Sequence, residues 1–318
     1  MIGYIGRRLI HSVLVVVVVS AIVFLLMRAL PGDPIDMMVS GSMLANITPE
    51  QVEQIRHDRG LDGPLIVQYF NWAGRMLTGD FGVSITNNYN INKELPPRIG
   101  VSLMLGLTSF VLGCLIGPVL GILCAIRRGK FLDNFLTILA NIGITAPVFW
   151  IAIFLMYIFA VQLRWVPIYG YTAPWEDFGM FVKQAVLPIT VGALGPIAGT
   201  TRQMRSSVLE VLGEDYIRTA WAKGLNERKV LLKHVLKNSL LPIITMQGQM
   251  LRGILGGSAI VEMIFVIPGM GKFMIDAMQS HDYTVVQGVT VIMTVMTVAC
   301  SLLVDLLYVW VDPRIQYD

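Results

Sequence analysis

Long apolar runs alternate with polar segments along the whole chain. The runs that we expect to cross a membrane are 9–30, 99–126, 131–163, 181–201, 240–261 and 284–311. A bilayer core about 30 Å thick is crossed by about 20 consecutive apolar residues in helical conformation. Because each run is of about this length or longer, the pattern predicts an all-α polytopic membrane protein with six transmembrane helices.

The first run follows two basic residues, Arg7 and Arg8. A secretory signal peptide has the same basic start, but this run is too long for one and no small-residue cleavage site follows it. We therefore predict an uncleaved first helix with a cytoplasmic N-terminus. We expect three parts: 1–30 with this helix, an extracytoplasmic segment 31–98, and a core of five helices over 99–318 that includes a cytoplasmic loop, 202–239.

The segment 31–98 is polar and rich in acids, with eight acidic and five basic residues, which favours the outer side of the membrane. Within it, apolar residues recur on one helical face and polar residues take another. These are Leu65, Tyr69, Trp72 and Met76 against Gln68, Asn71 and Arg75. The pattern predicts a short amphipathic helix, which either lies on the outer membrane surface or packs against the protein's own spans.

Proline and glycine mark two of the predicted spans. Pro147 interrupts the third run, and we expect a bend there because proline frees a backbone carbonyl. The fourth run contains several small or helix-bending residues, which allow helices to approach closely. They are Pro188, Gly192, Gly195, Pro196 and Gly199.

Composition supports the membrane interpretation. Hydrophobic residues make up 55% of the chain and charged residues only 14%, whereas soluble domains carry about a quarter charged residues. The net charge of +3 is unevenly placed and reports membrane topology rather than nucleic-acid binding. The cysteines Cys114, Cys124 and Cys300 all lie in apolar runs, so we expect buried side chains rather than a disulfide or a metal site.

The segment 213–242 is the most basic part of the chain and lies between two apolar runs. Helical spacing places Tyr216, Ala220 and Gly224 on one face of a first helix, and Gly224 permits a sharp turn. We expect a second helix over 227–237 and a start of the next span at Pro242. The predicted product is a cytoplasmic helix–turn–helix with a small-residue surface that another protein could contact.

Several motifs resemble one protein family. The spacing of Ala220, Gly224, Leu241 and Pro242 is similar to the signature loop of ABC importer membrane subunits, although Arg218-Thr219 replaces the usual Glu-Ala before the alanine. Further motifs resemble those of one branch of this family, the dipeptide/oligopeptide/nickel permeases, and they occur in the same order along the chain. They are LPGDP at 30–34, GDFGVS at 79–84, GEDYIRTAWAKG at 213–224, VEMIFVIPGMG at 261–271, DYTVVQG at 282–288 and VDPRI at 311–315.

This resemblance implies a type I ABC importer permease that moves peptides across a bacterial or archaeal cytoplasmic membrane, with both termini in the cytoplasm. It implies four partners besides membrane lipid: a second homologous permease, two ATPase subunits that carry ATP and Mg, and an extracytoplasmic binding protein. The residues expected to couple the permease to the ATPases are Glu214, Asp215, Tyr216, Ala220, Gly224, Leu225 and Pro242. The same branch includes importers of nickel or glutathione, which the sequence does not separate from peptide importers.

A second set of residues is a candidate translocation path. Arg252 is a charge inside the fifth predicted span, where an arginine usually faces the bundle interior or water. It could contact a substrate carboxylate, or it could snorkel or pair with the partner subunit. We group it with the neighbouring Gly256 and Gly257.

The sequence carries no chemistry for catalysis of its own. Gly271-Lys272 resembles the end of a nucleotide-binding P-loop, but Val266 replaces the first glycine and Phe273 follows the lysine. The four histidines are scattered, and we expect neither a metal nor a cofactor. An ion-coupled secondary transporter is the alternative of another class, and such proteins usually have carboxylates inside their spans. Here the predicted spans hold few acids before Asp305.

Overall fold

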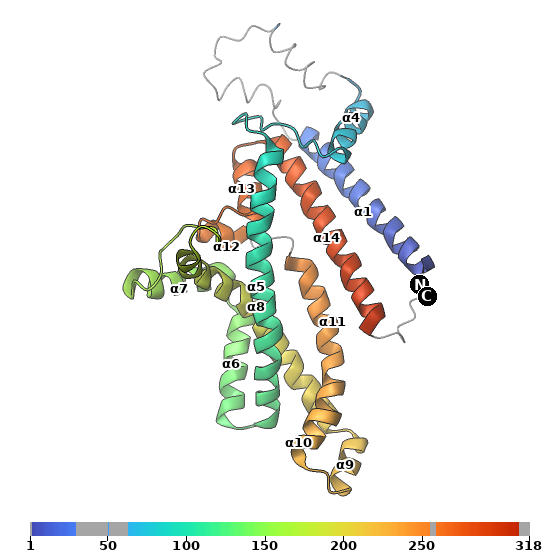
Figure 1. Ribbon diagram of the computed structural model, residues 1–318, viewed down its shortest axis with the longest axis vertical. Helices are drawn as coiled ribbons and strands as arrows, with labels where there is room; N and C mark the ends of the chain where they lie inside the picture. The colour runs from blue at the N-terminus through green and yellow to red at the C-terminus, as the bar shows by residue number, and fades with distance from the viewer. Residues whose placement is uncertain (1, 30–49, 51–62, 255–258, 312–318) are drawn as a thin grey trace. The chain divides into compact units, whose positions relative to one another are not determined.

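The computed structural model describes residues 2–29, 50, 63–254 and 259–311, and the side chains of residues 2–5, 252, 254 and 306–311 are outside this description. In the described residues the regular elements are helices, and an isolated bridge joins Val83 to Asn90 (Figure 1). The all-α prediction is therefore confirmed. The chain forms two compact units, one of 1–101 with 269–302 and one of 102–268 with 303–316. Two helices, α5 (Ile91–Ile126) and α14 (Tyr283–Val311), contribute residues to both.

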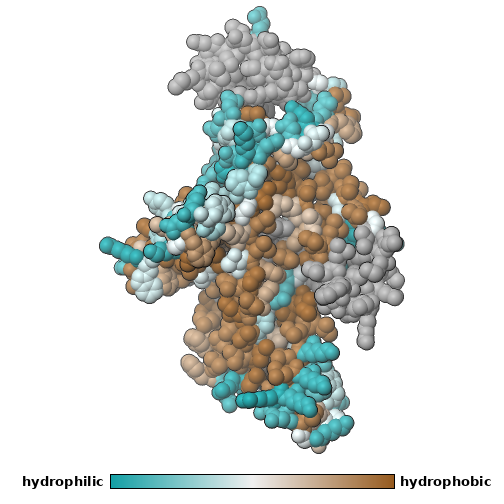
Figure 2. All heavy atoms as spheres, viewed as in Figure 1, coloured by the Kyte–Doolittle hydropathy of each residue, from teal (hydrophilic) through white to brown (hydrophobic). Residues whose placement is uncertain are grey.

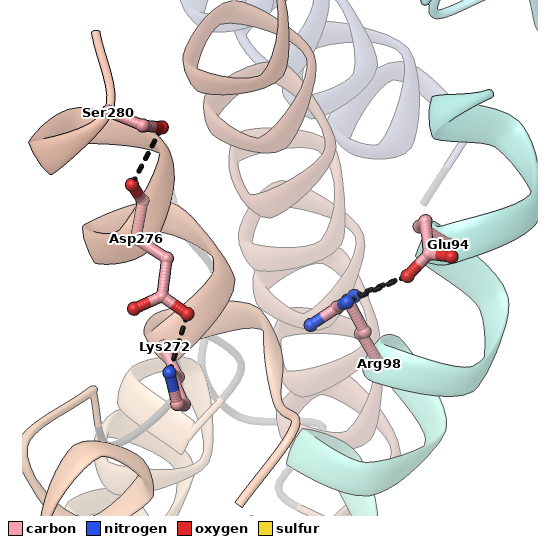
Figure 3. A network of polar contacts seen from close by, with 5 residues as sticks. All are labelled: Glu94, Arg98, Lys272, Asp276 and Ser280. Carbon is pink, nitrogen blue, oxygen red and sulfur yellow. Dashed lines mark hydrogen bonds and ion pairs between the residues drawn. The ribbon is translucent and has the colours of Figure 1, made fainter. Parts of the chain in front are cut away.

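The first unit contains α1 (Ile2–Ala29), α4 (Leu65–Leu77), α13 (Met270–Gln279) and the adjoining parts of α5 and α14. Its core brings α5, α13 and α14 together. The buried residues of this core are Ile91, Leu95, Met270, Phe273, Ala277, Val285, Val286 and Val289. Polar contacts lie near this core, and Figure 3 shows Glu94 paired with Arg98 and Lys272 paired with Asp276. The Glu94–Arg98 distance is 2.7 Å, and the Arg98 guanidinium also lies 4.1 Å from the centre of the Phe273 ring.

A buried carboxylate fixes the loop before α5. Asp282 accepts hydrogen bonds from the Ser84 hydroxyl, from the Ile85 backbone N–H at 3.2 Å and from the Thr86 hydroxyl at 3.0 Å. It also accepts from the backbone N–H of Val285 at 3.2 Å and so caps α14. Burial and then the charge of Asp282 raise the pKa of Tyr89 in the same loop.

In the second unit α8 (Phe178–Leu212) packs closely against α5 through a row of glycines. A Cβ added at Gly113, Gly117 or Gly121 would lie 2.6 Å from an atom of α8, which no real Cβ tolerates. The close approach leaves no space for larger residues at these three positions of α5. Of the small residues predicted in the fourth run, Gly192 contributes in the same way, because a Cβ there would lie 2.7 Å from the Ser109 hydroxyl.

The third predicted span breaks at the expected place. Helix α6 (Phe131–Thr145) ends just before Pro147, and α7 (Val148–Met156) with a π-helical extension η1 (Tyr157–Gln162) follows at an angle of 109°. The bend at Pro147 is confirmed, and it is far sharper than a proline kink within one continuous helix. Figure 1 shows α7 turning away from α6.

The number of spans is supported in part. Four described helices are long and apolar enough to cross a membrane, and the bent pair makes five if it counts as one span. The predicted run 240–261 corresponds to α11 (Leu236–Ile254) and α12 (Ala259–Ile264), and the residues between them are outside the described ranges. Six spans therefore remain a prediction. The helix that contains the predicted fourth span, 181–201, is longer than the span, because α8 continues to Leu212.

Candidate functional site

The basic segment 213–242 begins directly after α8. Gly213 ends that helix, and α9 (Asp215–Ala222) follows after Glu214, so both acids stand at a helix start as predicted. A second helix begins at α10 (Glu227–Val230) and continues through a π-helical turn η2 (Leu231–Val235) into α11. The predicted boundary at Pro242 is wrong, because Pro242 lies inside α11 and the second helix runs on without interruption.

A hydrophobic core lies beneath the basic segment. Ile217 and Ala220 of α9 pack with Met204 and Val208 of α8 and with Val230 after the turn. Ile217 is 0% exposed and Ala220 is 7% exposed. Helical spacing predicted that Ala220 shares an outward face with Gly224, and this prediction is wrong. The Ala220 methyl group instead contributes to the protein's own core. Leu225 is half-buried and packs against the same core.

The turn at Gly224 is confirmed, and its hydrogen bonds define it as a Schellman motif. Gly224 has a φ of +74°, a conformation in which glycine carries no steric penalty. Its N–H donates to the carbonyl of Trp221 at 2.9 Å, and the N–H of Leu225 donates to that of Ala220 at 3.3 Å. Nothing lies within 4 Å of a Cβ added at Gly224, so the turn conformation, rather than a neighbouring atom, requires glycine.

Polar contacts hold the two helices of the segment in place. The Asn226 side chain accepts from the backbone N–H of Arg228 and caps α10. The Asn238 amide donates to the Tyr216 hydroxyl at 2.9 Å and so joins α11 to α9. Buried Ser239 also lies 3.4 Å from the carbonyl of Ser207, to which its hydroxyl donates, and so joins α11 to α8. The core, the cap and these bonds together fix the position of α9 relative to α8 and α11.

The outward surface of the segment is basic and partly aromatic. Tyr216, Trp221 and Leu232 are exposed large side chains, and the surrounding cations are exposed as well. These cations are Arg218, Lys223, Arg228, Lys229, Lys233 and Lys237. Figure 2 shows the hydrophilic residues gathered around α9 and α10 and hydrophobic residues over the helices above them. Trp221 and Leu232 were not among the residues predicted for this surface, although an aromatic residue between Ala220 and Lys223 in a polar segment is a signal for an exposed contact.

A partly buried ion pair lies at the base of the segment. Arg205 of α8 binds Asp133 of α6 through two parallel bonds, Nε to Oδ1 at 2.7 Å and Nη2 to Oδ2 at 2.9 Å. Asp133 is 1% exposed, and its Oδ2 also accepts from the Gly129 N–H at 2.9 Å. This bidentate pair joins the end of α8 that leads into the basic segment to the turn between α5 and α6.

A cavity of about 380 Å³ lies within the second unit, between α5, α7, α8, α11 and α12. Its lining is mostly apolar or glycine, but Ser102 donates to the buried carboxylate of Glu262 at 2.6 Å at its edge. A space of this kind can hold an apolar group and orient it through one carboxylate. Glu262 directly follows the predicted run 240–261, so the sequence pattern did not indicate its position at the edge of this cavity.

The structure leaves the predicted translocation path untested. The side chain of Arg252 and the residues Gly256 and Gly257 lie outside the described residues. Met250 and Gly253, on the same helix as Arg252, line the cavity. The path therefore remains a prediction.

Comparison with known proteins places the chain in a family. Residues 117–317 match the family model described as "Binding-protein-dependent transport system inner membrane component", and residues 1–104 match its N-terminal companion. The oligopeptide transport system permease protein AppB of Bacillus subtilis (strain 168) is 39% identical over 320 residues, covering 100% of both chains. A Sinorhizobium fredii protein named "Probable peptide ABC transporter permease protein y4tP" is 37% identical, covering 99% of both.

One solved structure shares the fold. A chain of the MetNI methionine ABC transporter, seen in inward-facing conformations, superposes with a TM-score of 0.53 at 18% identity, over 69% of this chain and 96% of that one. At that identity the likeness concerns the fold, which is the type I importer permease fold expected from the sequence. Together with the full-length relatives, it shows that the chain belongs to the family of inner membrane components of binding-protein-dependent transport systems, the permease subunits of ABC importers.

Proposed function

We propose that this permease carries peptides, and that the cargo is di- or oligopeptides rather than nickel or glutathione. The observation that supports this is the identity of 37–39% over the full chain to proteins named for oligopeptide and peptide transport. Membership in the ABC importer family also argues against the alternative named above, an ion-coupled secondary transporter. Mass spectrometry of the ligand that remains on the co-purified binding protein tests the cargo. A nickel complex or glutathione there would reject other di- and oligopeptides as the cargo and leave the permease assignment intact.

The working assembly contains a second, homologous permease, two ATPase subunits that bind ATP and Mg, and an extracytoplasmic binding protein. It lies in the cytoplasmic membrane with six spans per permease and with both termini and the basic segment in the cytoplasm. The cation-rich surface of 213–242 supports this orientation. A cysteine at exposed Asn87, in the loop 78–90, tests it. It should react with an impermeant thiol reagent in intact cells; reaction only after lysis would reverse the topology.

In this assembly the basic segment 213–242 transmits the movement of the ATPases to the spans. The exposed surface of Tyr216, Trp221 and Gly224 contacts an ATPase groove. Buried Ile217 and Ala220 pass the displacement to α8, since they pack directly on Met204 and Val208. The Arg205–Asp133 pair carries it on to α6. Glu214 and Asp215 can meet basic groups of the ATPase in the same contact.

A pair of variants at Gly224 separates coupling from folding. Asparagine and aspartate both tolerate a positive φ, and a Cβ meets no atom within 4 Å there, so neither Gly224→Asn nor Gly224→Asp should unfold the segment. We expect Gly224→Asp to insert and pair normally but to lose ATPase binding or substrate-stimulated hydrolysis, because it adds a charge to the contact. Gly224→Asn, the matched neutral control, should keep both. Normal uptake and stimulated hydrolysis in Gly224→Asp would reject the coupling role.

Arg252 is proposed to lie on the translocation path, where its charge contacts a substrate carboxylate. An arginine inside a span is energetically unfavourable unless a polar group or water meets it, which motivates the proposal. We expect Arg252→Ala to assemble normally and to transport peptide more slowly. A wild-type rate of uptake in an assembled variant would remove this role.

A further inference from the structure

Helix α4 has three faces of different chemistry. At about 100° per residue, the first holds Tyr69, Trp72 and Met76, which is the apolar face that the sequence indicated. A second face holds Ile66, Phe70 and Leu77 at spacings of four and seven residues. A polar strip with Asn71 and Arg75 separates the two on one side. An ordinary surface helix has only an apolar and a polar face.

The first face packs against α1. The Phe24 ring lies 5.4 Å from that of Tyr69 and 5.6 Å from that of Trp72, centre to centre. The Tyr69 hydroxyl lies 2.9 Å from the Ser20 hydroxyl. The sequence placed Gln68 on the polar face, but its side chain is buried. Its side-chain oxygen accepts a hydrogen bond from Arg28 Nε at 2.8 Å. Of the two predicted alternatives, packing against the protein's own span therefore holds for this face.

These contacts fix the depth of α4 relative to the first span. The candidate span in α1 is Gly6–Ala29. At 1.5 Å per residue, Ser20 lies about 14 Å inside the end of the span at Ala29, and Phe24 about 8 Å inside. The side chains of Tyr69 and Trp72 therefore reach a level that lies inside the candidate span of α1. Gln68 contacts Arg28, which lies at the end of the span itself.

The second face is apolar and exposed. Ile66 is 72% exposed, Phe70 is 67% exposed and Leu77 is 90% exposed. Helix α1 also exposes apolar side chains in this half of its length, among them Ile22, Leu25 and Leu26. Only 11% of the candidate span in α1 is buried, so its apolar side chains are available to lipid, and α4 packs directly on this same helix.

We propose that α4 is an interfacial helix, and that its face of Ile66, Phe70 and Leu77 inserts among the acyl chains of the leaflet next to the Ala29 end of α1. The polar strip of Asn71 and Arg75 faces the lipid headgroups, where the arginine meets phosphate oxygens. Tyr69 and Trp72 hold the helix on α1. This arrangement requires only that the chain lies in a membrane and does not depend on the cargo or on the sidedness of the protein.

Nitroxide accessibility tests the proposal. Single cysteines replace Ile66, Phe70 and Leu77, with Asn71 and Arg75 as matched positions on the polar strip, in a chain whose native cysteines are changed to alanine. The full-length chain, with the subunits that remain bound to it, is reconstituted in phosphatidylethanolamine–phosphatidylglycerol vesicles. Collision rates with oxygen, which concentrates in lipid, and with water-soluble nickel ethylenediaminediacetate are then compared at each site.

At 66, 70 and 77 we expect oxygen to dominate, with an oxygen-to-nickel ratio several-fold above that at 71 and 75. A ratio at 70 equal to that at 71 would mean that the face meets water and would overturn the proposal. Exclusion of both reagents from 66, 70 and 77 would mean that protein covers the face, which also overturns it.

A measurement on the unsubstituted chain removes any dependence on variant folding. A lipid-soluble aryl diazirine is photolysed in the same vesicles, and the peptides from 63–78 are read by mass spectrometry. The adducts should fall on Ile66, Phe70 and Leu77 and not on Asn71 or Arg75. No adducts on these three residues, with adducts present on exposed α1 residues such as Leu25 and Leu26, would overturn the proposal.

Discussion

The helix ends at Gly224 and at Val266 have the same hydrogen bonds but different residues. After α12, the N–H of Val266 donates to Met263 at 3.3 Å and the N–H of Ile267 donates to Glu262 at 2.8 Å, the pattern already described after α9. The residue in the left-handed conformation has a φ of +74° at Gly224 and +53° at Val266. Glycine adopts this conformation freely, whereas a β-branched residue rarely does.

The surroundings explain how valine is tolerated. Phe265 and Ile267, on either side of Val266, are 3% and 1% exposed, and Glu262 is buried at the other end of the bond. At Gly224 the neighbouring Lys223 is exposed and Leu225 is only half-buried. The turn after α12 is therefore imposed by buried neighbours, and the turn after α9 depends on the freedom of its own glycine. Strain persists where the rest of the structure over-determines the backbone.

Ile267→Ala should have the largest effect, because it removes the packing that holds Val266 in place. Truncation of a fully buried isoleucine destabilises a protein by about 2–5 kcal/mol. The measurement is the unfolding free energy of the purified complex in mixed micelles with increasing dodecyl sulfate. Leu225→Ala, the equivalent position after α9, is the matched control and should lose clearly less. Equal losses would contradict the difference between the two turns.

Val266→Asn should stabilise the protein. Asparagine tolerates the left-handed conformation, and backbone strain of this kind amounts to about 1–3 kcal/mol. The gain in unfolding free energy should lie at the lower end of this range, because replacing the half-exposed valine also removes some apolar contact. The same unfolding titration measures it. A loss of stability in Val266→Asn would mean that the valine side chain, and not its backbone, is what the fold requires.

The sequence predicted the elements better than their faces. Helical spacing located α9 and the turn at Gly224, because an amphipathic pattern that ends in glycine is a local signal. It placed Ala220 outward, however, since a small residue in a polar segment does not reveal that Met204 and Val208 lie opposite it. Pro147 marked the break between α6 and α7, but a proline does not specify an angle of 109°.

Contacts between residues far apart in the chain were the main feature that the sequence did not predict. The pairing of Asp133 with Arg205 joins residues far apart in the chain, and neither stands in a motif that indicates the other. The depth of α4 on α1 follows from Tyr69, Trp72 and Phe24 together, and only the first two lay in the predicted pattern. The strain at Val266 could not be predicted from the sequence either. Pro268 and Gly269 after it indicate a turn, but they do not show which residue takes the positive φ.

Gly224→Ala should destabilise the basic segment modestly. Alanine in the left-handed conformation is less favourable by about 1–2 kcal/mol, and no contact is lost or gained because the space around the Cβ is empty. Hydrogen exchange of the α9 amides measures the local loss. Gly224→Asn should show a smaller loss. If alanine is as stable as glycine, the turn is imposed by its neighbours, as it is after α12, and the contrast between the two ends fails.

Arg218→Ala should have the smallest effect on folding. The guanidinium lies 3.4 Å from the Asp215 carboxylate, but both side chains are largely in solvent, where such a pair contributes little. The amide exchange of α9 should stay at the wild-type level, because Ile217, Ala220 and the hydrogen bonds at Gly224 hold the helix. If Arg218→Ala loosens α9 as much as Gly224→Ala does, surface charge and not the core and the cap positions the helix. If only ATPase binding falls, the exposed surface of α9 is a contact whose chemistry is separate from the forces that fold it.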